Sequence, residues 1–501
     1  MNQIMFSTSI SAQRSDLVDS HGELKTSLKT LDGKSISTVE LEAFIEQTLE
    51  GAGVTGLSCA ILNDAKLAYQ KAFGYRNKND GSLNDEQSIF AAASFSKTVF
   101  AYLVMLLVEE KVIDLDRPLY EYLDKPLYEY PAYADLKGDD RYLQITPRMV
   151  LGHTTGFPNL RFLMPDGKLG FLFPPGSRHS YAGEGMTLLQ VIVEEVTGRD
   201  LEALAQEKIF QPLGMTRSSF IWQPEFEANH ACPHDTYGRQ RGWKMKLPKA
   251  DGGGSMVTTA SDYARLLASI LNAKGIRKAT LDAMLESQIA INYRRMFGPE
   301  AWCETDEYQS IHLAWSLGWG RFDTPCGRAF FHTGHGPGWQ NYTVTYLDAG
   351  SGIVLLSNSD NFESVIEAIA KKAIGDIYSP YDWLGYVPFD PSQEKKAPPP
   401  DPVAIEVDQT ILAAYAGAYD MQPMATIKVK FEEQLLFILS RFGQSWQQLL
   451  AETEVSFFVQ GDEDWRVNFF RDDTDRATAL QLAYQGLEFP LAKKVVEQRA
   501  E

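Results

Sequence analysis

The sequence predicts an α+β fold followed by a smaller all-β domain. Strand-like segments lie near residues 54–75 and 341–357, and helices fill the interval between them. A proline-rich stretch then leads into a C-terminal region of short strands. At 501 residues, the chain is long enough for two or three domains with hydrophobic cores of their own.

We expect four segments along the chain. Residues 1–35, rich in Ser, Thr and Lys, are expected to form a poorly ordered lead-in, and residues 36–385 form the main domain. Prolines gather between Tyr386 and Pro402, which predicts a stiff linker over 386–404. Residues 405–501 alternate strand-like runs with turn residues, which predicts a small β-barrel or sandwich.

Within the main domain, periodicity places the principal elements. Two strands surround a turn at 63–65, and a second hairpin covers 341–357. The helix from Ser94 to about Lys111 is apolar on all sides, so it should be buried. Further helices are expected from about Thr187 to Thr197, ended by Gly198, and from about 362 to 374.

The start of the buried helix carries the first chemical signal. Ser94-Phe-Ser-Lys97 places a hydroxyl and an ammonium three residues apart, on one helix face. Free N–H groups and the positive dipole end at a helix start can stabilise an oxyanion. A buried lysine loses hydration, which lowers its pKa and allows it to act as a base. These residues predict a nucleophilic serine, whereas the same spacing at Ser392–Lys395 lies in the linker and carries no such prediction.

Two further segments supply groups for the same reaction. Tyr181 lies in a turn-rich loop before a helix, where a second proton carrier could be delivered. His332-Thr333-Gly334 precedes a glycine-rich turn, and a strand edge with glycine allows close backbone approach to a ligand. Each segment alone is a weak signal, and an exposed loop tyrosine is the ordinary alternative for Tyr181.

The three segments together resemble the class C β-lactamase and DD-peptidase superfamily of penicillin-recognising serine hydrolases. The resemblance covers roughly residues 36–380 and implies a β-lactamase/transpeptidase-like fold, an antiparallel sheet flanked by helices with a helical subdomain. Secondary landmarks agree in order: Leu151–Gly156, Pro212–Met215, Gly252–Ser255 and Thr259–Asp262. The segment Leu412–Tyr419 is loosely similar to lipocalin-like barrels appended to some members.

The resemblance implies roles for individual residues. Ser94 would be the acylated nucleophile, Lys97 its proton partner and Tyr181 the base or proton relay. His332, Thr333 and Gly334 would take the place of the family's Lys-Thr-Gly strand. The backbone N–H groups of Ser94 and of His335 would form the oxyanion hole, and water would hydrolyse the acyl-enzyme.

The sequence departs from the family pattern at two points. Tyr181-Ala-Gly183 replaces Tyr-x-Asn, which removes the side-chain amide that holds an acylamino group. Glu184 follows and is either a contact for a substrate amine or a solvated side chain. His332 replaces the lysine, as in DD-peptidase-like and D-aminopeptidase-like members. We therefore hypothesise that recognition of a substrate carboxylate by His332 weakens as pH rises above the histidine pKa.

Composition limits the partners. The net charge of −19 argues against nucleic acid and anionic membranes, and no run approaches the ~18 apolar residues of a membrane span. We expect no cofactor and no metal, since His230-Ala-Cys232-Pro-His234 lacks a second ligand group. Residues 10–13 resemble the tail of a cleaved export signal, which favours a periplasmic or secreted protein over a cytoplasmic one. A homo-oligomer remains open.

The leading hypothesis is a metal-independent serine hydrolase that cleaves a small amide, peptide or ester, with D-amino-acid peptides favoured. The alternative enzyme is a promiscuous carboxylesterase with weak β-lactamase activity. A third alternative is a penicillin sensor that acylates without turnover, or an inactive scaffold on the same fold.

Overall fold

The computed structural model describes residues 26–161, 164, 168–241, 246–392, 402–421, 425–439, 446–484, 487–488 and 491–495. The chain divides into two compact units. The first comprises residues 1–126, 140–156 and 173–394 and contains Ser94, Lys97, Tyr181 and His332. The second comprises residues 127–139, 157–172 and 395–501. Each unit is described by itself.

A nine-stranded antiparallel sheet forms the centre of the first unit. Its strands, in spatial order, are β5 (Ser82–Leu83), β4 (Lys66–Asn77), β3 (Gly56–Asn63), β13 (Ser351–Ser357), β12 (Trp339–Tyr346), β11 (Gly327–Gly336), β10 (Gly320–Thr324), β9 (Ala314–Trp315) and β8 (Ile289–Ala290). β3 pairs with β13, so strands from both ends of this unit share one sheet, as the sequence predicted. The predicted α+β class is therefore confirmed.

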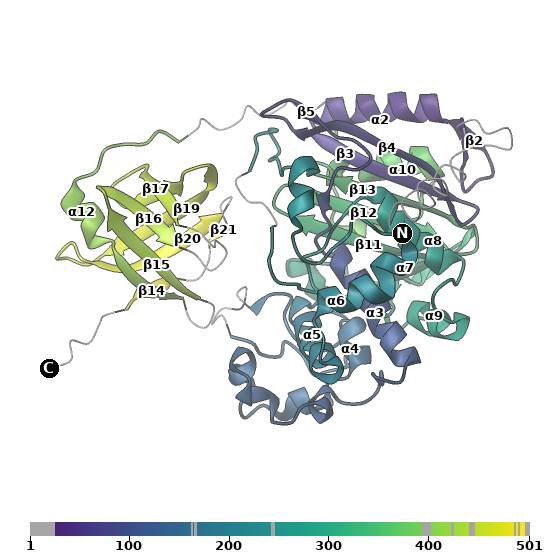
Figure 1. Cartoon of the computed structure of the whole chain (residues 1–501), viewed down its shortest axis with the longest axis horizontal. Coiled ribbons are helices and arrows are strands. Elements are labelled where there is room, and N and C mark those ends of the chain that lie inside the picture. Colours follow the sequence, from purple (N-terminus) through teal and green to yellow (C-terminus); the bar gives the residue numbers. More distant parts are fainter. Residues whose placement is uncertain are drawn as a thin grey trace, which may run out of the picture. The chain divides into compact units, whose positions relative to one another are not determined.

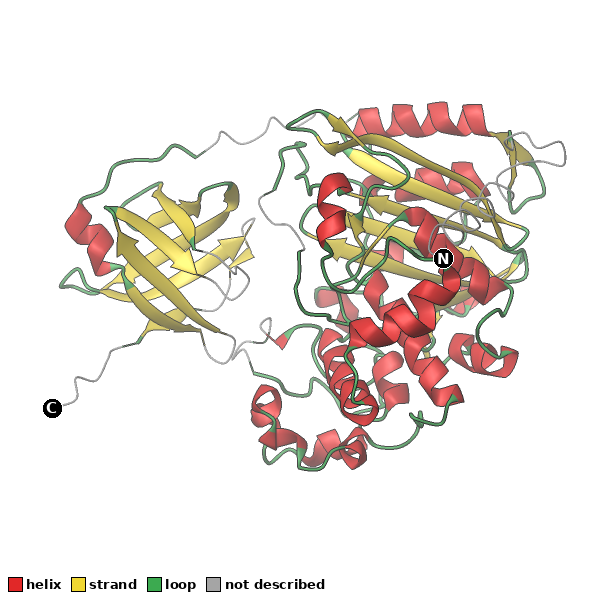
Figure 2. Ribbon diagram, viewed as in Figure 1, coloured by secondary structure: helices red, strands yellow, loops and turns green. Residues whose placement is uncertain are grey.

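Helices cover both faces of this sheet (Figures 1 and 2). Because successive side chains of a strand point to opposite faces, the complete burial of β3, β12 and β13 requires cover on both sides. The helices of this unit are α2 (Thr38–Ala52), α3 (Phe95–Glu109), α4 (Pro147–Leu151), α5 (Gly183–Thr197), α6 (Leu201–Ala205), α7 (Gln211–Leu213), α8 (Ala260–Leu271), α9 (Lys278–Leu285), α10 (Glu363–Ile374) and α11 (Tyr381–Leu384), of which α3, α8 and α10 pack on strands of the sheet.

α3 is the central helix for function. Thirteen consecutive residues from Phe95 to Leu107 are buried, because the helix has no polar face to present to water. α3 packs against β11, α6 and α9, which fixes its first turn beside the strand that carries His332. This burial confirms the expectation from the apolar sequence.

Two boundaries differ from those expected. Residues 27–37 belong to a short hairpin of β1 (Ser27–Lys29) and β2 (Ser35–Ser37), not to a disordered lead-in, because Leu28 and Ile36 are buried in the main core. Residues 1–25 lie outside the described residues. α5 begins at Gly183, four residues before the expected Thr187, because Gly185 and Met186 pack inside the unit.

The C-terminal part of the second unit is a closed barrel of eight strands in the described residues, and β21 adds to its edge. Pairing of β19 with β20 closes the ring. The strands are β14 (Gly417–Met421), β15 (Ala425–Glu432), β16 (Leu435–Leu439), β17 (Gln447–Ala451), β18 (Ser456–Val459), β19 (Asp462–Arg471), β20 (Ala477–Tyr484), β21 (Leu487–Glu488) and β22 (Ala492–Lys494), with α12 (Gln409–Ala414) before them.

The barrel has a core of its own. Tyr415 stacks on Phe469 with ring centroids 4.0 Å apart, and Phe457 meets Phe469 edge to face. The expected all-β C-terminal domain is thus confirmed. Its specific likeness to lipocalins stays a prediction. The predicted linker lies partly outside the described residues, which stop at 392 and resume at 402.

Candidate active site

Ser94 is the residue immediately before the first turn of α3, and its hydroxyl is not used to cap the helix. Ala93, just before it, adopts a left-handed backbone conformation with φ of 46°, which is uncommon for a residue with a side chain. The turn is held by Ser96, whose hydroxyl donates to the Ala93 carbonyl at 2.6 Å and accepts from the Met256 N–H at 2.9 Å. The Ser94 hydroxyl is therefore left available at the head of a rigid helix.

Lys97 donates to this hydroxyl. The distance from Lys97 Nζ to Ser94 Oγ is 3.0 Å, and a second hydrogen bond runs from Nζ to the Gly253 carbonyl at 2.5 Å. The side chain is buried, and desolvation lowers the pKa of Lys97 to about 8, although the negative charge of Asp251 opposes this shift. The ammonium can therefore release a proton near neutral pH.

Tyr181 completes the group. Lys97 Nζ lies 5.0 Å from the centroid of the Tyr181 ring. Burial raises the pKa of Tyr181, and its contact with the Ser94 hydroxyl partly offsets this effect. The phenol hydroxyl nevertheless makes no hydrogen bond of normal geometry within the described residues, so the contact with Ser94 is not a formed bond in this state. The structure brings the three side chains together as the sequence predicted.

The strand expected to hold the substrate runs past Ser94. β11 pairs with β12 as far as Gly336, but its pairing with β10 ends at Phe331. The stretch 332–336 therefore has an edge that no described strand covers. Gly334 approaches the turn before Ser94 so closely that a Cβ atom there would lie 2.5 Å from the Ala92 carbonyl oxygen. Only glycine fits this approach without displacing the backbone.

His332 differs from the expectation of a carboxylate-binding cation. It is 1% exposed, and desolvation together with the charge of Lys97 lowers its pKa to about 3. Its Nδ1 lies 2.6 Å from the carbonyl oxygen of Thr333, so Nδ1 carries the proton of the neutral ring. His332 is therefore uncharged throughout the neutral pH range, so recognition of a carboxylate through its charge would be confined to acidic pH.

The remaining predicted residues lie on β11 and at the start of α5. Thr333 is half-buried, and the His335 side chain is 63% exposed, with Nδ1 2.9 Å from Glu363 Oε1. Gly183 and Glu184 form the first turn of α5 and are half-buried. Their functional roles, like those of the backbone N–H groups of Ser94 and His335, remain predictions.

Sequence reasoning missed a cluster of buried rings behind Tyr181. We call it the histidine cluster; its members are His153, His179, Tyr181, Trp315 and His332. The His153 ring lies 4.4 Å from that of Tyr181, and Trp315 lies 4.9–5.9 Å from the other four rings. The Leu151–Gly156 motif pointed to His153, but no sequence signal linked Trp315 to the site.

Burial makes the histidines of this cluster neutral. The pKa of His179 falls to about 3 and that of His153 falls well below its usual value, in both cases because desolvation disfavours the charged ring. The neutral His153 accepts a hydrogen bond at Nδ1 from the Ala182 N–H at 3.1 Å. This bond holds the backbone next to Tyr181 and would be lost if Nδ1 were protonated.

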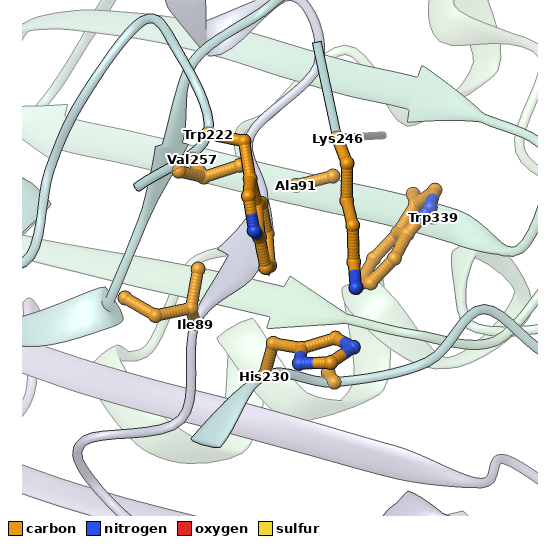
Figure 3. Close-up of a pocket in the computed structure, with 8 residues that line it drawn as sticks. Ile89, Ala91, Trp222, His230, Lys246, Val257 and Trp339 are labelled. Carbon is orange, nitrogen blue, oxygen red and sulfur yellow. The ribbon is translucent and has the colours of Figure 1, made fainter. Parts of the chain in front are cut away.

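A small apolar pocket lies near the nucleophile turn but is separate from the reacting groups (Figure 3). Its lining consists of Ile89, Ala91, Trp222, His230, Ala231, Lys246, Val257 and Trp339. Lys246 extends between the two indoles, with Nζ 5.0 Å from the Trp222 ring centroid. None of Ser94, Lys97 and Tyr181 lines this pocket.

No group of three or more His, Cys, Asp or Glu side chains in the described residues is arranged to hold a metal ion. No helix of the described ranges has both the length and the apolar character needed to cross a membrane.

Comparison with known proteins identifies the family of the main domain. Residues 41–375 match the family model described as Beta-lactamase, and residues 401–497 match a domain of unknown function, DUF3471. Penicillin-binding protein 4 of Amycolatopsis lactamdurans is 24% identical over 388 residues, which cover 74% of this chain and 94% of that protein. Esterase EstB of Burkholderia gladioli is 24% identical over 311 residues, covering 52% and 77%.

Solved structures give the same result for the fold. The octameric penicillin-binding protein homologue from Pyrococcus abyssi has a TM-score of 0.55 at 21% identity and covers 91% of this chain and 100% of its own. The matched family model spans more than half of the 501 residues and includes every predicted catalytic position. The chain therefore belongs to the Beta-lactamase family, within the superfamily of class C β-lactamases and DD-peptidases.

Proposed function

We propose that the protein is a serine hydrolase that forms an acyl-enzyme at Ser94 and cleaves a small ester, amide or D-amino-acid-containing peptide. The observation that carries this proposal is the 3.0 Å contact between Ser94 Oγ and Lys97 Nζ, combined with the lowered pKa of Lys97. A nucleophilic hydroxyl next to a base that titrates near pH 8 is the arrangement that acyl transfer needs. Relatives named as a penicillin-binding protein and an esterase support the same reaction class.

The mechanism assigns the base to Lys97. Neutral Lys97 accepts the proton of the Ser94 hydroxyl while Oγ attacks the substrate carbonyl carbon. Tyr181 has a raised pKa, so it remains a phenol that can donate its proton to the departing oxygen or nitrogen and recover one from Lys97. The backbone N–H groups of Ser94 and His335 would stabilise the oxyanion, and water then releases the acyl group from Ser94.

The charges at the site narrow the range of leaving groups that a substrate can have. A substrate with a carboxylate next to its leaving nitrogen, such as a peptide ending in D-alanine or a penicillin-type β-lactam, would need a cation where His332 stands. That ring is neutral and buried, whereas Asp251 adds a negative charge that acts on Lys97. We therefore favour a substrate whose leaving group has no carboxylate: an ester, or a peptide amide cleaved by a D-aminopeptidase-type reaction. Carboxypeptidase and β-lactamase activities rank below these.

Parallel turnover of three substrates tests the proposal. D-alanyl p-nitroanilide, p-nitrophenyl acetate and a chromogenic cephalosporin are assayed with the wild type and with Ser94→Ala. We expect the acetate or the anilide to be hydrolysed, the cephalosporin to be a poor substrate, and Ser94→Ala to lose about 10³-fold or more of kcat/KM. Full activity in Ser94→Ala would reject the site. A burst with the cephalosporin and no turnover of any substrate would favour the sensor alternative.

Self-association is a separate proposal. The octameric homologue from Pyrococcus abyssi supports a homo-oligomer for this chain too. Light scattering of the purified protein across a tenfold range of concentration gives the mass directly, and a monomer at all concentrations would reject it.

A further inference from the structure

Phe297 is the one exposed ring among the aromatic neighbours of Tyr181 within the described residues. Its centroid lies 5.7 Å from that of Tyr181, at an interplanar angle of 77°. His153, Trp315 and His332, the other rings around Tyr181, are at most 1% exposed, whereas Phe297 is 52% exposed. Of the rings that contact Tyr181 in the described residues, Phe297 is thus the one that a solvent-borne group can touch.

Phe297 is held firmly in this exposed position. Its loop is closed at the base by a bridge between Tyr293 and Glu304 and by the Arg294 N–H donating to the Cys303 carbonyl at 3.0 Å. The Met296 N–H donates to the Trp383 carbonyl at 2.8 Å, and Met296 itself is buried. The loop turns just after Phe297, so the ring projects from a fixed tip.

The same loop is tied to the segment that carries Tyr181. Arg178 donates to the Ala301 carbonyl at 2.7 Å, and its guanidinium lies 4.5 Å from the centroid of the Trp302 ring. His179 Nδ1 and the Tyr293 hydroxyl are 2.6 Å apart. These contacts lie two and three residues before Tyr181, so they fix the position of Phe297 relative to the phenol.

We propose that Phe297 forms an apolar wall that selects substrates with an apolar or aromatic substituent on the leaving group. The inference rests on the proposed hydrolase function, in which Tyr181 hands a proton to the departing atom and must lie beside it. A half-exposed phenylalanine packed on that phenol is then the first surface that the leaving group meets. Contact with it removes apolar area from water on both partners, which favours binding.

The surrounding charges agree with this choice. A neutral His332 provides no ionic contact for a leaving-group carboxylate, and Arg178 has its guanidinium engaged by the Ala301 carbonyl and the Trp302 ring. An apolar substituent needs no charged partner. The described rings around Tyr181 therefore offer a leaving group the apolar face of Phe297 and no charged partner at His332.

The test varies the leaving group at nearly constant chemical reactivity. Phenyl acetate, p-methylphenyl acetate and p-butylphenyl acetate release phenols of similar pKa but increasing apolar bulk. For the wild type we expect kcat/KM to rise about tenfold along this series. Phe297→Ala should abolish the rise, and Phe297→Leu should retain part of it. Leu83→Ala, at an exposed apolar position on edge strand β5, is the matched control and should leave the series unchanged.

A second series isolates the leaving-group side. p-Nitrophenyl acetate and butyrate differ only in the acyl group, so their ratio should be the same in the wild type and in Phe297→Ala. The proposal is overturned if Phe297→Ala keeps the wild-type rise along the leaving-group series, if it lowers all substrates equally, or if it changes the acyl ratio instead.

Binding without turnover separates this inference from the proposed function. p-Butylphenol should raise the melting temperature of Ser94→Ala but not that of the Ser94→Ala/Phe297→Ala double variant. If this difference appears while no ester is hydrolysed, the reaction is wrong and the apolar wall stands. If esters are hydrolysed with no such selectivity and no such difference in melting temperature, the proposal for Phe297 is wrong and the proposed hydrolase function is retained.

Discussion

Burial has opposite consequences on the two sides of the candidate active site. At the start of α3, desolvation lowers the pKa of Lys97 to about 8, into the range where it can exchange protons. In the histidine cluster, desolvation lowers the pKa values of His179 and His332 to about 3, out of that range. The outcome depends on the unperturbed pKa of each group. Lysine starts at about 10.4, so burial brings its pKa toward neutral pH, whereas histidine starts at about 6.5, so burial takes its pKa below the range in which it can exchange protons.

The largest effect is expected from substitutions of Lys97, the base beside the Ser94 nucleophile. Lys97→Arg keeps a positive charge that cannot be given up, and Lys97→Met keeps the length of the side chain without any base. Both variants should lose about 10³-fold of kcat/KM on p-nitrophenyl acetate at pH 8, because no group is left to accept the Ser94 proton. Melting followed by circular dichroism checks that each variant is folded. An arginine variant with more than a tenth of wild-type activity would contradict the role of Lys97.

The pH dependence of the wild-type enzyme is a second test of the role of Lys97. Because the lowered pKa of Lys97 is about 8, kcat/KM should rise with pH and level off above that value. His332 is neutral on both sides of pH 6.5, so we expect no separate change there for neutral substrates.

The next effect concerns the histidine side and appears in stability. The pKa of His179 is lowered in the folded state, so below pH 6.5 the unfolded chain binds a proton that the folded protein does not. Stability should therefore fall as pH decreases from 6.5 toward 3, by about 1.4 kcal/mol per pH unit for one such histidine. His179→Gln should reduce this slope in urea unfolding followed by tryptophan fluorescence.

Leu83→Ala is the control for that measurement. Its side chain is 62% exposed and carries no titratable group, so the substitution should leave the slope as in the wild type. An equal slope in the wild type and in His179→Gln would show that His179 is not held neutral by the fold.

The smallest effect concerns the contribution of Asp251 to the pKa of Lys97. Asp251→Asn removes a negative charge that raises the pKa of Lys97, and an amide oxygen can still accept the hydrogen bond from the Gly253 N–H. The pH at which kcat/KM levels off should therefore move down by a few tenths of a unit, because Asp251 is exposed and water screens its charge. Asp32→Asn, an exposed acid in the loop between β1 and β2, should cause no shift.

Local sequence patterns predicted much of the fold and the grouping of Ser94, Lys97 and Tyr181. The apolar run after Ser94 predicted a buried helix, and the spacing of Ser94 and Lys97 on one face predicted their contact. The start of α5 at Gly183 was missed, because only tertiary packing of Gly185 and Met186 makes that glycine-rich segment helical. The barrel was predicted as a class, while its shortest strands, such as β22, have no distinct sequence pattern.

The charge of His332 could not be obtained from its neighbours in sequence. It depends on Trp315 and Tyr181, the second of which lies about 150 positions away, and on the ammonium of Lys97. Phe297 was missed for a similar reason, since its contact with Tyr181 exists only after the loop at 293–304 is folded. Desolvation and long-range contact are properties of the folded chain rather than of a motif.

The neutral, buried His332 also bears on how this protein could be inhibited. Penicillin-like drugs anchor through an anionic group, and this strand gives that anion no counter-charge. On the proposed reaction at Ser94, we expect uncharged warheads with an aryl arm, such as boronate esters or neutral phosphonates, to inhibit more strongly than anionic β-lactams.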